Sequence, residues 1–238
     1  MKKKILFLAA THGDEGFSIP ILRKLSNEGY EGKFDWIIGN PRALKKEKRF
    51  IDADLNRVAP GDKNNSKYEF RRAYELQQKF DQYEYVIDLH GTEAKTGIFT
   101  IVTNPKIENL ILASLFPVQN IVIWEPSDWT QPGSLTRYTK CGLEIECGPK
   151  NSPVIKTQLY NILKGIQKNG FNLDTQKIQQ QTFYRVYGSL LKKELKSIDI
   201  KLNEFEEVNV NNERFYPLLV NRYTDIVCYK MEEININF

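Results

Sequence analysis

Short apolar runs alternate with stretches of helical periodicity along the first two thirds of the chain, and this alternation strongly restricts the fold. Apolar runs bounded by turn residues predict strands at 5–9, 34–38, 85–89, 97–103, 121–124 and 142–146. Helical spacing between them predicts helices at 15–28, at 67–80 with Ser66 as the N-cap, at 107–116 and at 154–167. Such an order is typical of an α/β protein, in which helices flank a mixed, largely parallel sheet.

The pattern of alternating strands and helices ends after Asn169 and Gly170. A polar, glutamine-rich segment at 174–181 indicates a linker, and β-type runs follow at 182–186, 215–220 and 226–229, with one weaker helical segment at 189–196. We therefore predict a first domain over residues 1–174 and a small β-rich C-terminal domain over residues 175–238.

Charge alone does not decide the class of protein, because a modest positive charge suits an anionic small substrate as well as a nucleic acid. The net charge of +4 comes from 34 basic and 30 acidic residues that are scattered along the chain, and no nucleic-acid-binding motif is present. No apolar stretch approaches the roughly 20 residues of a membrane span. The three cysteines show no metal-type spacing and cannot form a complete set of disulfides, so we expect a cytoplasmic protein that binds neither nucleic acid nor membrane.

The chain has only two histidines, and each comes just after a predicted strand. His12 follows the strand at 5–9 and His90 follows the strand at 85–89, at the edge of the sheet where open α/β proteins bind ligands. Glu15 comes three residues after His12, on the same face of a nascent helix. Two imidazoles and one carboxylate with a fourth position for water are typical of a catalytic zinc site.

An ordinary structural role competes with this interpretation, because an isolated histidine is more often a packed residue than a metal ligand. The equivalent placement of both histidines at strand ends favours the metal. Asp88 lies on the same side of its strand as His90 and either hydrogen-bonds that imidazole or only pairs locally.

A polar segment between the histidines offers groups that can bind a carboxylate. Arg49, Asn56 and Arg57 supply two guanidinium groups and an amide, and a guanidinium grips a carboxylate with two parallel hydrogen bonds. The alternative is a solvated loop with internal arginine–aspartate pairs.

Two acidic residues interrupt the apolar run at 142–146. Alternation along a strand places Glu144 and Glu146 on the same side, so the pattern does not choose between them. Burying a carboxylate costs free energy, so an acidic residue in an apolar strand indicates a function. Glu146 is the better candidate, because it is nearer the strand end where the candidate ligands lie.

Five motifs now resemble one family in order and approximate spacing. They are HGDE at 12–15, NPRA at 40–43, RFIDADLNR at 49–57, DLHGT at 88–92 and IECGP at 145–149. Together they resemble the succinylglutamate desuccinylase/aspartoacylase family, which is related to the zinc carboxypeptidases. The resemblance implies a zinc-carboxypeptidase-like sheet. It is looser in the C-terminal third, where the segment at 216–221 matches a late family motif.

The resemblance implies a role for each matched position in the metal site and in catalysis. The residues that match the ligands of one Zn²⁺ per chain are His12, Glu15 and His90. Glu146 matches the carboxylate that activates the water, and Arg49 matches the arginine that stabilises the charged tetrahedral intermediate.

Further positions match the residues that bind substrate in the family. Asn56 and Arg57 match the pair that binds the carboxylate end of the substrate, and Arg137 matches a second substrate arginine with a register shift of one residue. Tyr223 matches a late substrate-facing tyrosine, with Tyr229 as the alternative.

The implied activity is hydrolysis of the amide bond of a carboxylated N-acyl amino acid. A peptidase or an esterase that uses the same site, and a non-catalytic metal-binding protein with the same fold, are alternatives. The sequence names neither the acyl group nor the amino acid, and it leaves the oligomeric state open. Trp124 and Trp129 flank a proline-containing segment that forms either part of a pocket rim or only a packed loop.

Overall fold

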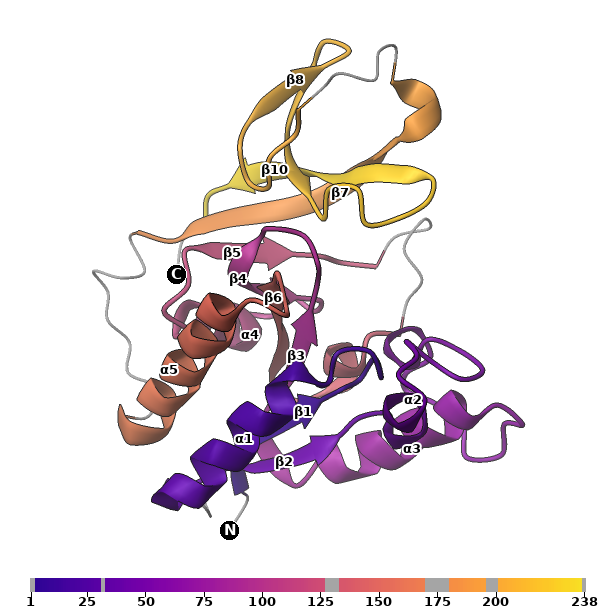
Figure 1. Ribbon diagram of the computed structural model, residues 1–238, viewed down its shortest axis with the longest axis vertical. Helices are drawn as coiled ribbons and strands as arrows, with labels where there is room; N and C mark the ends of the chain where they lie inside the picture. Colours follow the sequence, from indigo (N-terminus) through magenta and orange to yellow (C-terminus); the bar gives the residue numbers. More distant parts are fainter. Residues whose placement is uncertain (1–2, 31–32, 127–132, 170–179, 196–200, 237–238) are drawn as a thin grey trace.

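The computed structural model describes residues 3–30, 33–126, 133–169, 180–195 and 201–236 (Figure 1). In these residues, ten strands form one sheet in the order β2-β1-β3-β6-β4-β5-β7-β10-β9-β8. The strands are β1 (Lys3–Ala9), β2 (Asp35–Ile38), β3 (Tyr83–Gly91), β4 (Gly97–Val102), β5 (Asn120–Ile123), β6 (Gly142–Gly148), β7 (Thr182–Leu191), β8 (Val208–Val210), β9 (Glu213–Leu218) and β10 (Ile226–Ile234). The helices are α1 (Ile19–Leu25), α2 (Pro41–Lys45), α3 (Tyr68–Phe80), α4 (Ile107–Ser114) and α5 (Pro153–Asn169).

The sheet is mixed and mostly parallel. Strand β1 pairs in parallel with β2 and β3, β3 pairs in parallel with β6, and β5 pairs in parallel with β4 and β7. Antiparallel pairing joins β4 to β6 and links the last strands, β7, β10, β9 and β8. The predicted α/β class with a largely parallel sheet and flanking helices is therefore confirmed.

The two faces of the central strands pack against different helices. In β1, Phe7 and Ala9 face a core that includes side chains of α1, α4 and α5, whereas Leu6 and Leu8 face α3. Successive residues of a strand point to opposite faces, so one apolar run supplies both cores. His90 and Glu146 alternate with Leu89 and Ile145, which belong to the first core, and therefore lie on the α3 face.

The C-terminal strands cover the far part of this same face (Figure 1). Phe99 and Ile101 of β4 pack with Tyr184 of β7, with Met231 of β10 and with Leu219. The predicted boundary between domains at 174/175 and most of the predicted linker lie outside the described residues, and the two-domain division stays a prediction. Strand β7 pairs with β5, so the sheet runs on from the first region into the second.

Local differences from the predicted elements have physical causes. Helix α3 begins at Tyr68 with Lys67 as its N-cap, so Ser66 does not cap it. The helical segment predicted from 189 is wrong, because Ser189 and Leu190 pair with β10 and a short 3₁₀ turn follows only at Lys192–Glu194. Cross-strand pairing overrides a weak helical preference. The three-residue strand β8 was not predicted.

The segment after His12 is less regular than the single helix predicted at 15–28. A 3₁₀ turn at Gly16–Ser18 precedes α1, and a wider turn at Ser26–Tyr30 ends it at Gly29, which adopts a φ of 84°. Among the described residues, none of the helices is long and apolar enough to cross a membrane.

Candidate metal centre and substrate cavity

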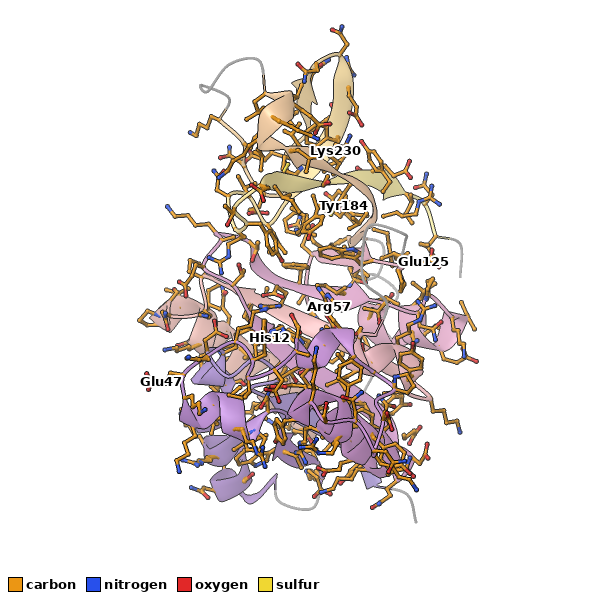
Figure 2. The ribbon with its side chains drawn as sticks, turned by 90° about the vertical axis from the view of Figure 1, so that its right-hand side faces the viewer. His12, Glu47, Arg57, Glu125, Tyr184 and Lys230 are labelled. Atoms are coloured by element: carbon orange, nitrogen blue, oxygen red, sulfur yellow. The ribbon has the colours of Figure 1, made fainter. Side chains whose placement is uncertain are left out.

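A cavity of about 550 Å³ opens beside the carboxyl ends of β1 and β3, on the α3 face of the sheet. Figure 2 shows His12 and Arg57 in the middle of the molecule, with Tyr184 and Lys230 above them in the C-terminal strands. The residues that line the cavity come from both parts of the chain, from His12 in the first turn to Tyr229 in β10.

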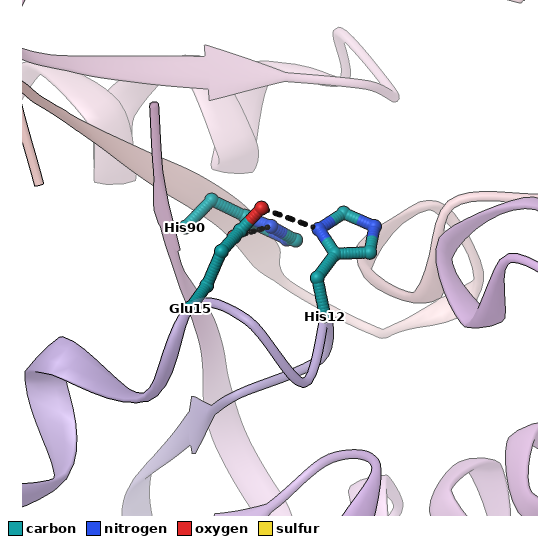
Figure 3. Close-up of side chains that lie close together, drawn as sticks. All are labelled: His12, Glu15 and His90. Atoms are coloured by element: carbon teal, nitrogen blue, oxygen red, sulfur yellow. Dashed lines mark hydrogen bonds and ion pairs between the residues drawn. The ribbon is translucent and has the colours of Figure 1, made fainter. Parts of the chain in front are cut away.

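The three predicted metal ligands meet at this cavity, although they are far apart in the sequence. His12, Glu15 and His90 are all at least nine-tenths buried, and each offers one ligand atom within 4.8 Å of the others. The Glu15 carboxylate lies between the two rings (Figure 3), with Oε1 2.9 Å from Nδ1 of His12 and Oε2 3.2 Å from Nδ1 of His90. Both Nδ1 atoms therefore face the same point.

The other nitrogen of each imidazole lies close to a carboxylate. Nε2 of His12 lies 3.0 Å from Oδ1 of Asp54. Nε2 of His90 lies 3.0 Å from Oδ2 of Asp88, which is an ion-pair distance without hydrogen-bond alignment. Asp88 is itself fully buried and accepts hydrogen bonds from Thr11. A carboxylate behind each imidazole fixes the ring orientation and raises its basicity, as in known metal sites.

The electrostatics of the cluster favour positive charge at this point. Burial by itself lowers the pKa of His12, but the charge of Glu15 and the hydrogen bonds with Asp54 and Glu15 outweigh it and leave the pKa raised. Burial is also outweighed at His90, where Asp88 and Glu15 hold the pKa well above its usual value. Two imidazoles and a carboxylate that converge in such a field fit a divalent cation such as Zn²⁺.

The backbone before and after His12 is specialised to place its ring. Ala10 adopts a φ of 54°, in the left-handed region that residues with a side chain rarely occupy. Strain of this kind persists at functional sites where the surrounding contacts hold it. A Cβ at Gly13 would lie 2.1 Å from the carbonyl carbon of Ala43, so only glycine permits this close approach to α2.

Strand pairing places the candidate base beside the candidate ligand. Glu146 of β6 is the register partner of His90 of β3, and both side chains line the cavity. The Glu146 carboxylate accepts no hydrogen bond from any described residue, so its oxygens are available to water. Burial raises its pKa to about 8, with a further contribution from the negative charge of Glu15. A nearby cation would favour the ionised form and lower that pKa.

Glu144 lies two residues earlier in β6, where it is the register partner of Asp88, and it also lines the cavity. Its side chain has a different environment from that of Glu146. Oε1 accepts hydrogen bonds from Nδ2 of Asn56 at 3.0 Å, from Oγ of Ser134, and from Oγ1 of Thr136 at 3.4 Å. Glu144 is thus held by neighbouring side chains, whereas Glu146 is not.

The segment at 49–57 is organised by a carboxylate that we did not predict from the sequence. Glu69 on α3 is fully buried and accepts hydrogen bonds from the backbone N–H groups of Ile51, Asp52 and Ala53 at 2.7–3.2 Å, and from Asn40 at 3.1 Å. Three successive backbone donors wrapped around one anion form a rigid turn. An acidic residue in the first turn of a helix is ordinary, so no sequence signal separates Glu69 from a surface glutamate.

Arg49 is brought to the metal centre by this segment. Nε and Nη2 donate to Oδ2 of Asp54 at 3.1 and 2.9 Å, and Nη1 lies 3.6 Å from Oε1 of Glu15. Burial lowers the pKa of Arg49, but Asp54 and Glu15 outweigh this and raise it. Asp54 therefore fixes both Arg49 and His12, a role that the sequence analysis did not assign although the residue lies within the RFIDADLNR motif.

Asn56 and Arg57 also line the cavity. Oδ1 of Asn56 accepts from the backbone N–H of Leu135 at 3.0 Å, and Nδ2 donates one hydrogen to Glu144, which leaves the second amide hydrogen as a donor for a ligand. The Arg57 guanidinium donates to the carbonyl of Asn56 at 2.8 Å and has no carboxylate partner among the described residues.

The C-terminal strands supply the opposite wall of the cavity. Tyr223 and Tyr229 both line it, with ring centroids 5.6 Å apart, so the structure places both alternatives there. Trp124 packs edge-on to Tyr229 at 4.5 Å. Arg222, which the sequence analysis missed, also lines the cavity, and its guanidinium has no carboxylate partner among the described residues.

The backbone that presents Arg222 and Tyr223 is held in an unusual conformation. Leu219 and Asn221 have φ values of 54° and 56°, and the buried end of Glu204 accepts the backbone N–H groups of Leu219 and Val220 at 2.8 Å. The positions of these side chains are thus set by long-range contacts that a sequence pattern does not reveal.

Of the predicted positions, one lies away from the described cavity wall and one lies outside the described residues. Arg137 does not belong to the described cavity wall, and its Nη1 donates to the carbonyl of Thr103 at 3.4 Å. Its role as a substrate arginine stays a prediction. Trp124 and Pro126 line the cavity, which fits the pocket-rim alternative, but Trp129 lies outside the described residues.

The sequence matches one catalytic-domain family and its curated members. Residues 1–169 match the succinylglutamate desuccinylase/aspartoacylase catalytic domain. A probable aspartoacylase of Prochlorococcus marinus (strain MIT 9215) is 35% identical over 164 residues, which cover 61% of this chain and 54% of that protein. An N-acyl-aromatic-L-amino acid amidohydrolase (carboxylate-forming) B of Danio rerio is 29% identical over 181 residues, 65% of this chain and 57% of that protein. The matched parts span about half the length of these relatives.

Solved structures match over nearly the whole chain. Murine aminoacylase 3 superposes with a TM-score of 0.74 at 20% identity, covering 98% of this chain and 96% of that one. A succinylglutamate desuccinylase from Chromobacterium violaceum superposes with a TM-score of 0.71 at 17% identity, covering 99% and 86%. At such identities the superpositions establish the shared fold, while the match over residues 1–169 establishes kinship. The chain therefore belongs to the succinylglutamate desuccinylase/aspartoacylase family.

Proposed function

We propose that this protein is a zinc-dependent hydrolase that cleaves the amide bond of a carboxylated N-acyl amino acid. The observation that carries the proposal is the meeting of His12, Glu15 and His90 at one buried point, with Glu146 one strand away. The names of the relatives, aspartoacylase and N-acyl-amino acid amidohydrolase, support an amide of this kind as the substrate.

The chain's own residues have defined tasks in this reaction. A Zn²⁺ ion held by His12, Glu15 and His90 would act as a Lewis acid and lower the pKa of a water to roughly 7. Glu146 takes a proton from the attacking water as the water oxygen bonds to the amide carbonyl carbon. When the carbon–nitrogen bond breaks, Glu146 returns the proton to the leaving amine.

Arg49 stabilises the negative charge that develops on the carbonyl oxygen of the substrate. Its Nε and Nη2 are fixed by Asp54, and Nη1 lies beside Glu15 at the centre of the site. A donor that is held in place before the reaction is worth about 3–4 kcal/mol of transition-state stabilisation.

The substrate is oriented by a guanidinium that has no carboxylate partner among the described residues and by a neighbouring amide. Arg57 and the amide of Asn56 lie on one side of the cavity, and both suit the carboxylate end of an amino acid. Tyr223 closes the cavity from the C-terminal side, where it is 38% exposed.

A hydrolysis screen with zinc-loaded protein tests the proposal. N-acetyl, N-succinyl and other N-acyl amino acids are compared with peptides and with ester analogues of the same acids. We expect release of the free amino acid from N-acyl substrates at a higher kcat/KM than from peptides or esters. Hydrolysis of peptides alone would favour the peptidase alternative. Stoichiometric zinc without turnover of any substrate would favour a non-catalytic metal-binding protein.

A further inference from the structure

Glu144 is a second carboxylate on the cavity wall that the proposed reaction does not use. It is 6% exposed and is held by three side-chain donors, all of which bind Oε1. Oε2 accepts no hydrogen bond from any described residue. Although Oε2 has no partner among these residues, protein atoms do not enclose it completely, and Glu144 lines the cavity. Oε2 is therefore accessible from the cavity. One oxygen of Glu144 is therefore anchored and the other faces the cavity.

The charge of Glu144 helps to raise the pKa of the buried His90 imidazole, but Glu144 has no ion-pair partner among the described residues. None of the described ion pairs includes Glu144, and its register partner in β3 is another acid, Asp88. A buried carboxylate without a counter-ion is unfavourable unless a ligand supplies the positive charge. The proposed metal would lie beside Glu146, which is two residues, or roughly 7 Å, further along the strand than Glu144. The metal would therefore not be a direct counter-ion of Glu144.

The position of Glu144 indicates which part of a substrate it would meet. Nδ2 of Asn56 donates to Glu144 at 3.0 Å, and Asn56 and Arg57 are the residues assigned above to the carboxylate end of the substrate. Glu144 is thus adjacent to the place of the amino-acid portion and not to that of the acyl group.

The geometry points to a substrate whose amino-acid portion carries a basic side chain, with its ammonium group bound by Oε2 of Glu144. This inference rests on the proposed function, since it takes the orientation of the substrate from Asn56 and Arg57. It makes the substrate an N-acyl diamino acid in which the second amino group is free and charged. Arg57 would bind its carboxylate and Glu144 its ammonium group, so each charge of the substrate would meet a side chain of opposite sign on either side of Asn56.

Binding of free amino acids tests the inference without requiring turnover. Zinc-loaded protein is titrated calorimetrically with lysine and with norleucine, which differ only by the terminal ammonium, and likewise with ornithine and norvaline. We expect each basic amino acid to bind with a Kd about tenfold or more below that of its neutral counterpart, because one partner of the hydrogen bond is charged. Equal Kd values, or no binding by lysine and ornithine, would overturn the inference.

Glu144→Gln is the matched variant, since it keeps the Oε1 acceptor and the side-chain volume but removes the charge. We expect the preference for lysine over norleucine to fall to within about twofold. Glu125→Gln removes the same charge from an exposed position near the cavity rim and is expected to keep the preference. An unchanged preference in Glu144→Gln, with parental zinc content and melting temperature, would also overturn the inference.

Hydrolysis of the corresponding N-acetyl derivatives then separates the two proposals. Selective binding of lysine or ornithine without hydrolysis of any N-acyl amino acid would contradict the proposed function and leave the basic-side-chain site standing. Hydrolysis of N-acetylnorleucine as readily as N-acetyllysine would contradict the inference and leave the hydrolase standing.

Discussion

His90 and Glu146 face the same cavity as register partners in the neighbouring parallel strands β3 and β6. Their separation is set by hydrogen bonds between the two strand backbones, and not by flexible loops. The proposed ligand and the proposed base, on adjacent strands, therefore keep their relative geometry through a reaction, which is a requirement for efficient proton transfer. The consequences of this arrangement can be measured.

Replacing Glu146 with Gln should separate metal binding from catalysis. The amide keeps the side-chain volume but cannot accept a proton, so we expect kcat to fall by about 10²–10⁴. The zinc content, measured by mass spectrometry on the purified protein, should stay at one ion per chain. Parental kcat in this variant would refute the assigned role of Glu146.

Replacing His90 with Ala should release the metal. The site would keep only one imidazole and one carboxylate, and we expect the zinc content after dialysis to fall well below one ion per chain. Tyr160→Phe on α5, far from the cavity, is the control and should retain the metal. A full complement of zinc in His90→Ala would show that the ligands were assigned wrongly.

Replacing Asp54 with Asn should weaken zinc binding through His12. Loss of a carboxylate that orients a ligand imidazole typically costs 10–100-fold in metal affinity, and we expect a Kd increase of about that size in a chelator competition assay. Arg49→Gln removes another partner of Asp54 and leaves the Asp54–His12 contact in place, and it also removes a positive charge 3.6 Å from Glu15, which would favour a cation. That variant should not weaken zinc binding, and an equal loss in both would argue against an effect transmitted by the imidazole.

Replacing Glu69 with Gln should disturb the segment that carries Arg49. Donor amide hydrogens would then oppose backbone N–H groups, and each unsatisfied buried group costs about 1–3 kcal/mol of unfolding free energy. We expect a lower midpoint in urea unfolding together with a fall in kcat that is larger than the change in KM. Glu75→Gln, an exposed position on the same helix, should change neither quantity.

Removal of the metal should lower thermal stability. A ligand that binds only the folded chain stabilises it by about 2.7 kcal/mol at a free concentration 100 times its Kd. We expect the melting temperature in excess zinc to drop on addition of a chelator and to recover when zinc is restored. In His90→Ala the chelator should have little effect, and a drop equal to that of the parent would place the stabilising metal elsewhere.

The amino-acid sequence by itself determined the α/β class, most strands and helices, and the candidate ligands. These features depend on local periodicity and on the order of motifs, and both can be recognised in the sequence without knowledge of tertiary contacts. Alternation placed Glu144 and Glu146 on one side of a strand, and the position of His12 and His90 after apolar runs placed both at one sheet edge. The sequence was insufficient where local preference and tertiary pairing conflict, as at Ser189 and Leu190.

Only the tertiary structure decided which side chains meet across long separations. It separated Glu146, which accepts no hydrogen bond from the described residues, from Glu144, which accepts hydrogen bonds from Asn56 and Ser134. It also placed Tyr229 and Arg222 in the wall of a cavity that is lined by His12 and Glu15 as well. It showed that the Arg137 side chain donates to the carbonyl of Thr103. These outcomes depend on packing between segments far apart in the chain, and such contacts leave no periodic trace in a single sequence.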